Sequence, residues 1–541
     1  MIFKRIFITI ATSVLLFLSI NLGAQSQNFK IGKSLEVQMN VLNQINMLYV
    51  DSVNLDSLVI ESTKVMLELL DPYTVFIPDE ESESLELLTT GSYGGIGAVI
   101  RKDGNNVLIS EVYENTPASK AGLHDGDLIV AIDGESVTPL RVDECSTKMK
   151  GPAGTDVLFT IKRLRGGDTT DLKITREKVH FPDVLYAGMI SDSVGYIRIT
   201  GFTLNGSKDV KKALVELKKN ASLSRLILDI RGNGGGLLDE AVEIVSLFVP
   251  KNTLVVSSKG KVKEAQMEYF TTSEPVDTLL PLVVMVNSGS ASSSEIVAGA
   301  LQDLDRATII GTRTFGKGLV QSIRDVGYNN KIKITTAKYY TPSGRCVQAI
   351  DYSQRNEDGS VGYIPDSLTR PFKTLLKGRT VYDGGGVTPD IKIEPPFYSR
   401  PALALLYAQI LHEYSILYFR DHDSIASPSN FELTLEEYAN FVNWAVEKDF
   451  DHRTATEVEF DKFVEIAKKE SLFSLMSKET ELLDNIVKMS KRDVLETRME
   501  EIKPLLEEEI VNRYYFQEGR AQSMLRNDTQ IKKASVVELI N

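Results

Sequence analysis

The chain has 541 residues, a formal net charge of −13 and only two cysteines. The length predicts several domains, and a hydrophobic fraction of 42% is enough to give them buried cores. The negative charge argues against nucleic acid as a partner and gives no steering toward other anions. Cys145 and Cys346 fall in different predicted domains, so we expect free thiols and no disulfide framework. No cluster of Cys and His suggests a metal site, and no cofactor is expected.

Residues 1–24 have the pattern of a secretory signal peptide. Lys4 and Arg5 form the basic start, residues 6–20 form the apolar centre, and Leu22-Gly23-Ala24 is an acceptable cleavage site. The alternative is an uncleaved membrane anchor, although the apolar run is a little short for a spanning helix of about 20 residues. We therefore expect the protein to be exported, either to a periplasm or to the outer side of the inner membrane.

The segment 25–88 is predicted to be mostly helical. Between Lys33 and Leu48, apolar residues recur at the spacing of one helix face. This stripe consists of Leu35, Met39, Leu42 and Ile45.

The segment 89–180 is predicted to be a β-rich domain that opens on a glycine loop. Gly94 to Gly97 leave backbone N–H groups open, which suits them to surround an anion. The strand expected at 98–101 offers an edge for pairing with an extended peptide. Asp133-Gly134 is typical of the tip of a hairpin.

These features, together with Thr116-Pro117-Ala118 and Gly126-Asp127-Leu128-Ile129, resemble a PDZ domain. The resemblance implies that the loop binds the carboxylate at the C-terminus of a substrate. The residues it assigns to this role are Gly95, Ile96, Gly97 and Ala98. Without the later motifs, the glycine run would be interpreted as an ordinary turn.

The segment 181–397 is predicted to be an α/β unit. The apolar runs at 195–199, 226–230 and 282–286 are typical of buried strands. The second run leads into the glycine loop 231–236 and a helix. A dinucleotide-binding fingerprint fails there because Leu237 stands at the third glycine position.

A serine-rich turn follows the run 282–286, and Lys317 lies between two glycines further on. A serine hydroxyl is a weak nucleophile and needs a base. No histidine lies between residues 181 and 411, which weakens a Ser–His pair without excluding one that uses His180. A lysine can act as the base if its amine is neutral, and burial lowers the pKa of a lysine.

The motifs Gly289-Ser290-Ala291-Ser292 and Thr314-Phe315-Gly316-Lys317-Gly318 closely resemble those of the C-terminal processing (tail-specific) serine peptidases. The resemblance implies that Ser292 is the nucleophile and that Lys317, 25 residues later, is the base. It also implies that Gln321 orients the lysine amine. The alternative interpretation of Ser292 and Glu295 is a capping box, which only satisfies backbone donors.

The resemblance further implies an oxyanion hole built from backbone N–H groups. One donor would be Gly235 or Gly236, between which the sequence does not choose, and the second would be Ser293. Two residues depart from the family pattern, because Ser293 stands where alanine is common and Cys346 where serine is common. Neither change removes a catalytic group.

The segment 398–541 is predicted to be helical. Only one glycine, Gly519, occurs after Pro401. A helical stripe is expected at Leu403, Leu406, Tyr407, Ile410 and Leu411. The charge-rich end, 482–541, is interpreted as a solvated helical surface or, alternatively, as a dimerisation or adaptor surface. A homodimer or an adaptor protein could thus bind through the N- and C-terminal helical regions.

The resemblance therefore predicts a multi-domain α/β protein. Its parts would be a layered protease core similar to crotonase and Clp-type proteases, an inserted PDZ domain and a helical C-terminal region. The expected function is that of an exported endopeptidase that recognises free C-termini of proteins and peptides and cleaves with a Ser–Lys dyad. The alternative is a catalytically inactive PDZ scaffold or adaptor, against which the intact Ser292, Lys317 and Gln321 argue.

Overall fold

The computed structural model describes residues 27–81, 87, 89–164, 167–352 and 361–540. The chain forms two compact units, one of Met1–Glu80 with Gln321–Thr335 and one of Glu81–Val320 with Thr336–Asn541. The predicted signal peptide, residues 1–24, lies outside the described residues. Within the described part of the chain, no helix is both long enough and apolar enough to cross a membrane.

The smaller unit is built from the N-terminal helices and part of a long hairpin. A helix over residues 27–48 confirms the helical prediction, and α2 (Leu55–Glu68) follows. Strand β1 (Val75–Ile77) pairs antiparallel with β18 (Asn330–Tyr340). Strand β17 (Leu319–Gly327) pairs with β18, and the boundaries between the two units fall inside these two strands.

The segment of the larger unit that resembles a PDZ domain forms an antiparallel sheet in the order β3-β4-β5-β7-β8, with the short β6 (Glu135–Ser136) beside β5. The hairpin predicted at Asp133-Gly134 is confirmed, because β5 and β6 pair Ile132 with Glu135 across it. Two helices, α4 (Pro117–Lys120) and α5 (Val142–Met149), complete the domain. The other strands are β3 (Ala98–Asp103), β4 (Asn106–Val112), β5 (Leu128–Ile132), β7 (Asp156–Lys162) and β8 (Thr169–Thr175).

The PDZ domain begins and ends on two neighbouring strands. Strand β2 (Ser92–Gly95) pairs antiparallel with β9 (Glu177–His180), and Ser92 faces His180 across the pair. The chain therefore enters and leaves the domain side by side, which is the arrangement of an inserted domain.

The segment predicted to be the protease core is built on a six-stranded sheet in the order β10-β11-β12-β15-β16-β21. Strand β10 is antiparallel to its neighbour and the others are parallel. Parallel strands are buried on both faces, which explains their continuous apolar runs. The strands are β10 (Val184–Met189), β11 (Val194–Ile199), β12 (Arg225–Asp229), β15 (Leu282–Val286), β16 (Thr308–Gly311) and β21 (Ile391–Lys392).

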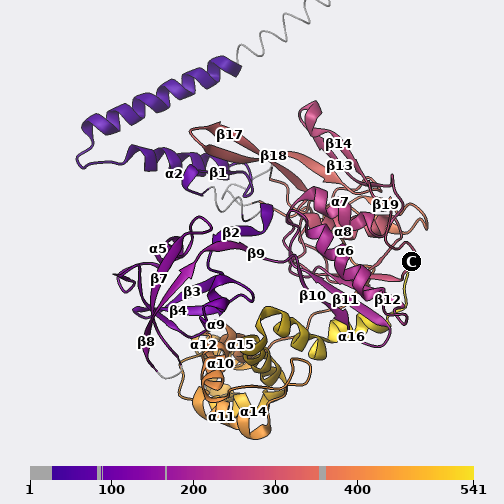
Figure 1. Cartoon of the computed structure of the whole chain (residues 1–541). Helices are drawn as coiled ribbons and strands as arrows, with labels where there is room; N and C mark the ends of the chain where they lie inside the picture. The colour runs from indigo at the N-terminus through magenta and orange to yellow at the C-terminus, as the bar shows by residue number, and fades with distance from the viewer. Residues whose placement is uncertain (1–26, 82–86, 88, 165–166, 353–360, 541) are drawn as a thin grey trace, which may run out of the picture. The chain divides into compact units, whose positions relative to one another are not determined.

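Helices cover both faces of this sheet (Figure 1). On one face lie α6 (Gly206–Leu217), α7 (Leu238–Ser246) and α8 (Ser293–Asp303), and on the other lies α16 (Thr529–Val536). All residues of α8 are buried. The helix is enclosed because the end of β18 and the segment around Val387 also pack against it, as Tyr339 and Val387 belong to the same core cluster.

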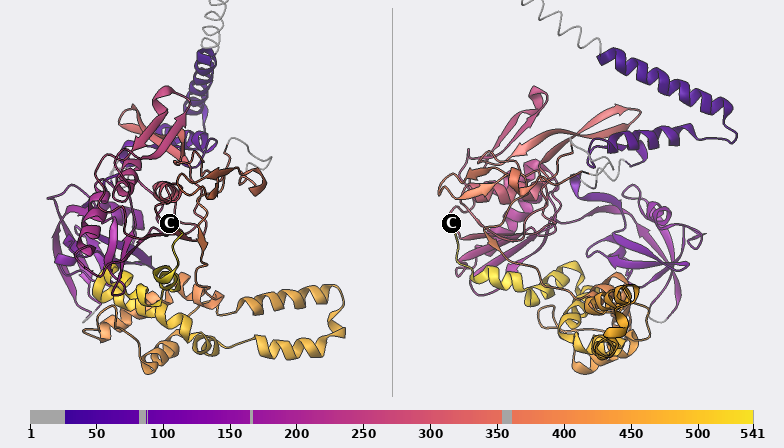
Figure 2. Two further views of the ribbon diagram at one scale, coloured as in Figure 1. Left: turned by 90° about the vertical axis from the view of Figure 1, so that its right-hand side faces the viewer. Right: turned by 180° about the vertical axis from the view of Figure 1, so that it is seen from behind.

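The C-terminal region is helical, as predicted, but the stripe expected from Leu403 to Leu411 is interrupted. Gln409 has a positive φ of 58° that ends α9, and Tyr407 is 82% exposed. The helices are α9 (Arg400–Tyr407), α10 (Ile410–Asp421), α11 (Leu435–Ala445), α12 (Ala455–Lys469), α13 (Ser477–Val487), α14 (Lys491–Thr497), α15 (Met499–Asn527) and α16. In Figure 2 (left), α12 and α13, in orange, form a hairpin that extends from the other C-terminal helices.

The interpretation of residues 482–541 as a solvated surface is wrong for most of this segment. In α15, Ile502, Leu506 and Ile510 are fully buried and belong to the core of the C-terminal helices. Charged residues on the same helix are paired, which lets it be buried despite its composition. Arg526, for example, donates to the buried Glu507 at 2.6 Å.

Candidate active site

Ser292 lies at the sharp turn between β15 and α8, where its backbone has φ 55° and ψ −113°. A positive φ is unfavourable for a residue with a side chain and is found where function requires it. The turn stands at the carboxyl end of a parallel strand, beside the end of β12. This is the edge at which α/β sheets carry their ligand and catalytic sites.

The hydroxyl groups of the serines near Ser292 donate hydrogen bonds to backbone carbonyls in or next to the glycine loop of residues 231–236. The Ser290 hydroxyl donates to the carbonyl oxygen of Ile230 at 2.8 Å, that of Ser294 to the carbonyl of Asn233 at 2.9 Å, and that of Ser293 to the carbonyl of Gly236 at 2.9 Å. All three serines are buried. The second hydroxyl that the sequence places next to the nucleophile therefore fastens the loop to the start of α8.

Glu295 connects the serine turn to the lysine loop. Its carboxylate is fully buried, and one oxygen, Oε2, accepts the N–H of Ser292 at 2.9 Å and the N–H of Lys317 at 2.8 Å. The other oxygen accepts the N–H of Gly316 at 2.8 Å and the hydroxyl of Thr314 at 2.6 Å. Burial raises the pKa of Glu295, while these four donors act in the opposite direction. The side chain thus does more than cap its own helix.

Tyr339 joins the same two residues through their carbonyl groups. Its hydroxyl lies 2.8 Å from the carbonyl oxygen of Lys317 and 3.1 Å from that of Ser292. Burial raises the pKa of Tyr339, which keeps the donor proton on the oxygen. Together with Glu295, it holds the backbones of Ser292 and Lys317 at fixed places. No motif in the sequence marks Tyr339, because its partners come from other elements.

The glycine loop touches the predicted nucleophile. A Cβ atom on Gly235 would lie 2.8 Å from the Cβ of Ser292 and 3.0 Å from the nitrogen of Ser293, so only glycine fits there. The Gly235 N–H already donates to the side-chain oxygen of Asn233 at 2.9 Å. In the described residues, no comparable acceptor is found for the N–H groups of Gly236 and Ser293.

The remaining predicted residues lie as follows. Lys317 is half-buried in the loop between β16 and β17, next to the buried Leu319. Gln321 lies in β17, in the smaller unit, where its side-chain amide donates to the hydroxyl of Thr335 at 3.2 Å. Its role in orienting the lysine stays a prediction. His180 bonds Ser92 through Nδ1 at 3.1 Å, which gives the Ser–His alternative no support.

The predicted carboxylate loop is part of the PDZ fold. Gly95 ends β2, Ala98 begins β3, and Gly97 between them has a φ of 80°. Ile96 is 1% exposed and belongs to the PDZ core. Strand β3 pairs only with β4 among the described strands, and α5 contacts it, so one edge of β3 is unpaired beside a helix.

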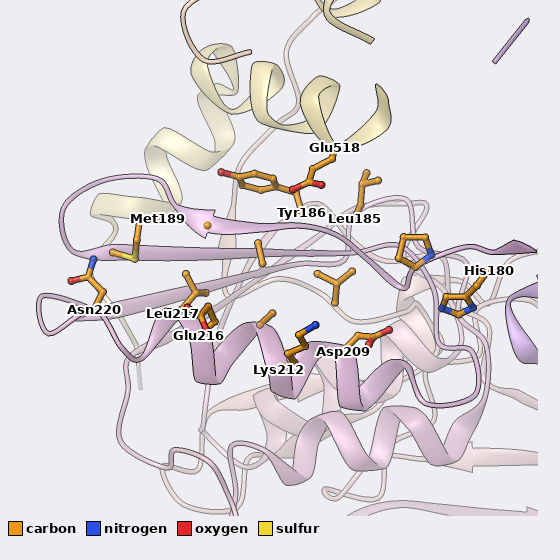
Figure 3. A pocket seen from close by; sticks show the side chains of 15 residues that line it. His180, Leu185, Tyr186, Met189, Asp209, Lys212, Glu216, Leu217, Asn220 and Glu518 are labelled. Atoms are coloured by element: carbon orange, nitrogen blue, oxygen red, sulfur yellow. The ribbon is translucent and has the colours of Figure 1, made fainter. Parts of the chain in front are cut away.

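A cavity of about 870 Å³ lies away from these residues, between β10 and α6. Figure 3 shows Asp209 and Lys212 pointing from α6 toward β10, with Tyr186 and Glu518 on the opposite side of the strand. His180, from the Ser–His alternative, lines this cavity, whereas Ser292, Lys317 and Gln321 do not.

Three family models match the chain. The model of peptidase family S41 matches residues 193–354, that of a PDZ domain matches 108–163, and that of the C-terminal helical domain of a probable PDZ-protease matches 402–537. A carboxy-terminal-processing protease of Bartonella bacilliformis is 34% identical over 346 residues, which cover 63% of this chain and 76% of that protein. A probable CtpA-like serine protease of Staphylococcus aureus is 34% identical over 345 residues, which cover 63% of this chain and 68% of that protein.

Among solved structures, the photosystem II D1 C-terminal processing protease is 27% identical, with a TM-score of 0.36, and the match covers 66% of this chain and 92% of that one. The sequence matches and the fold define a serine protease core with an inserted PDZ domain and a helical C-terminal domain. This chain belongs to peptidase family S41, among the carboxy-terminal-processing proteases.

Proposed function

We propose that this protein is an endopeptidase in which Ser292 and Lys317 form the catalytic dyad. The observation that carries the proposal is the buried Glu295 carboxylate, which accepts the N–H groups of both residues on one oxygen. The strained backbone of Ser292 and the commitment of the neighbouring hydroxyls to loop carbonyls also favour Ser292 as the nucleophile. Loss of peptide cleavage on replacing Ser292 by alanine, with the fold retained, tests this assignment.

Each half of the reaction requires a proton to move onto the lysine amine and off it again. The neutral amine of Lys317 takes the proton of the Ser292 hydroxyl while the serine oxygen attacks the carbonyl carbon of the scissile bond. The lysine then gives this proton to the leaving amine, and an acyl-enzyme remains on Ser292. Water then gives a proton to the same amine while its oxygen attacks the acyl carbon, and the amine passes that proton to the serine oxygen as the second product leaves. Gln321 would orient the amine without transferring a proton.

The negative charge on the substrate oxygen would be stabilised by two backbone N–H groups. We assign them to Gly236 and Ser293, because the N–H of Gly235 is already taken by Asn233. Ser293 is the first residue of α8, and the positive end of a helix dipole favours an anion there. Such donors act on the charge that develops in the transition state, so they raise kcat rather than substrate affinity.

We further propose that the PDZ domain captures the substrate's C-terminus. The glycine loop supplies backbone donors for the carboxylate, and the unpaired edge of β3 suits strand pairing with an extended peptide. The region involved comprises Gly95, Ile96, Gly97 and Ala98, as the sequence predicts.

Amidating the C-terminus of a peptide substrate should raise its KM, because amidation removes the anion that the loop binds. Gly97→Ala should raise KM for the free peptide in the same way, since a Cβ there would lie 2.4 Å from the Cβ of Thr116. Gly134→Ala is the matched control, with the same φ of 80° and open space around the Cβ. The measurement is steady-state cleavage of the free and amidated peptides. Equal KM values for both peptides with the intact enzyme would defeat the tail-recognition proposal and leave the dyad standing.

The protein is proposed to act outside the cytoplasm, in a periplasm, after removal of residues 1–24. This rests on the basic start, apolar centre and small-residue end of that segment. N-terminal sequencing of the protein from cells should find a chain that begins near Gln25. A chain that retains Met1 would instead favour the membrane-anchored alternative.

Pairing with a second copy or an adaptor is proposed for the helical ends of the chain. The helix 27–48 carries apolar side chains that are largely exposed in its unit, which supports a binding role for this face. They include Phe29, Leu35, Met39, Met47 and Leu48.

A further inference from the structure

The guanidinium of Arg231, the first residue of the glycine loop, is held from two sides. On one side it donates to Asp229, from Nη2 to Oδ2 at 2.6 Å and from Nε to Oδ1 at 3.0 Å. On the other side its acceptors come from the C-terminal region. Nη2 donates to Asp528 Oδ2 at 2.7 Å, and Nη1 donates to Gln530 Oε1 at 2.6 Å. The last helix of the chain thus contacts the residue at which the loop begins.

The side chains of Asp528 and Gln530 are also held by hydrogen bonds to groups other than Arg231. The Oδ1 oxygen of Asp528 accepts the N–H groups of Gln530 and Ile531 at 2.8 and 2.9 Å, so it caps α16 and leaves Oδ2 for the arginine. The side-chain nitrogen of Gln530 donates to the carbonyl oxygen of Ile393 at 2.8 Å. Both acceptors are therefore set in place by their own hydrogen bonds.

Helix α16 is docked along the sheet of the protease core. Ile531 and Ala534 are buried against Val283 and Met285 on the face opposite α8. At the other end of the helix, Arg225 Nη1 donates to the carbonyl oxygens of Ala534 and Ser535 at 3.1 and 2.8 Å. The helix is part of the core rather than an appended surface element.

The positive charges of Arg198 and Arg231 are balanced only if both Asp229 and Asp528 are included. Asp229 is fully buried and pairs with both Arg198 and Arg231. Burial alone would raise the pKa of Asp229, but these two arginines bring it down to about 2, so the carboxylate is ionised. Two cations then face one anion, and Asp528 supplies the second. Removing one partner from a buried ion pair leaves an uncompensated charge, which is strongly unfavourable.

We propose that Asp528 and Gln530 are positioning residues for the oxyanion loop, so that α16 supports catalysis without touching the substrate. The inference rests on the proposed function, because it matters only if the loop's N–H group stabilises the oxyanion. Gly232 follows Arg231 directly and gives the backbone freedom to shift when the guanidinium moves. Since the oxyanion exists only in the transition state, a shifted loop lowers kcat and leaves KM nearly unchanged.

The test uses two variants and one matched control in the full-length protein. Asp528→Asn keeps the helix cap, because asparagine caps as well as aspartate, but removes the charge that faces Arg231. Gln530→Leu removes the oxygen that accepts from Arg231 Nη1 and replaces the side chain by one of similar size. Arg225→Met weakens the other end of α16 and does not touch Arg231. The measurements are kcat and KM for a peptide with a free C-terminus, the inhibition constant of a peptide aldehyde, and the unfolding temperature, with kinetics run below the unfolding temperature of every variant.

Asp528→Asn and Gln530→Leu should each lower kcat by about 10- to 100-fold, with KM within about threefold of wild type. Binding of the aldehyde, whose adduct with a serine carries the oxyanion, should weaken by a similar factor. Arg225→Met should lower the unfolding temperature and leave kcat within about threefold.

Unchanged kcat in both variants would overturn the inference and leave the proposed function intact. An equal loss of kcat in Arg225→Met would also overturn it, because loosening of α16 in general would then explain the effect. If Asp528→Asn does not fold, the kcat of Gln530→Leu alone tests the inference. A wild-type protein that cleaves no peptide would overturn the proposed function and this inference together.

Discussion

Replacing Lys317 by methionine is expected to reduce peptide turnover by about 10⁴-fold or more while the fold is retained. Methionine keeps an apolar stem of similar length and removes the amine, so the Ser292 hydroxyl loses its base. Turnover is measured as kcat on an unstructured peptide, and the fold is checked by the unfolding temperature.

Lys317→Arg is the matched control for the charge at this position. A guanidinium stays protonated and cannot accept a proton, so this variant should be as inactive as the methionine variant. The double variant with Ser292→Ala should be little worse than either single one, because residues that act as a unit are not additive. An arginine variant with wild-type turnover would show that Lys317 acts through its charge and not as a base.

Glu295→Gln should produce the second large effect, on stability and turnover together. An amide has one acceptor oxygen, whereas the carboxylate of Glu295 accepts four donors on two oxygens. The amide nitrogen would face two donors, and each unsatisfied buried group costs about 1–3 kcal/mol. We expect a lower unfolding temperature and a kcat reduced by about 100-fold, because the backbones of Ser292 and Lys317 lose their common anchor.

Thr314→Ser is the conservative control for this prediction. It keeps the hydroxyl that donates to Glu295 at 2.6 Å, so it should leave kcat close to wild type. The paired measurement is thermal unfolding and steady-state cleavage of both variants. A Glu295→Gln protein with wild-type stability and turnover would show that the carboxylate does not hold the two residues in place.

Much of the protease core could be predicted from local pattern. The apolar run 282–286 coincides with β15, and the runs 195–199 and 226–230 match β11 and β12 to within one residue. Parallel strands buried on both faces leave such continuous runs, and the Asp133-Gly134 hairpin was recognisable because its turn requires positive φ.

The interactions that organise the site could not be predicted, because they join distant segments. Glu295 has the pattern of a capping box, and nothing local shows that it also accepts the N–H of Lys317. Arg231 and Asp528 are 297 positions apart. The apolar stripe from Leu403 to Leu411 has the pattern of one helix, but Gln409 has a positive φ and interrupts it. This could not be predicted, because glutamine is not a residue that marks a left-handed backbone. The composition of α15 predicts a solvated helix, because the pairing of Arg526 with Glu507, 19 residues away, and of Arg513 with Asp125 leaves no local pattern.

The most direct test of the central claim is digestion of one unstructured peptide with a free C-terminus by wild type, Ser292→Ala and Ser288→Ala, with the products identified by mass. Ser288 is an exposed serine in the same turn and serves as the matched control. The account predicts cleavage by wild type and Ser288→Ala, and no cleavage above the uncatalysed rate by a folded Ser292→Ala protein. Cleavage by Ser292→Ala at the wild-type rate would contradict the account and assign the nucleophile to another residue.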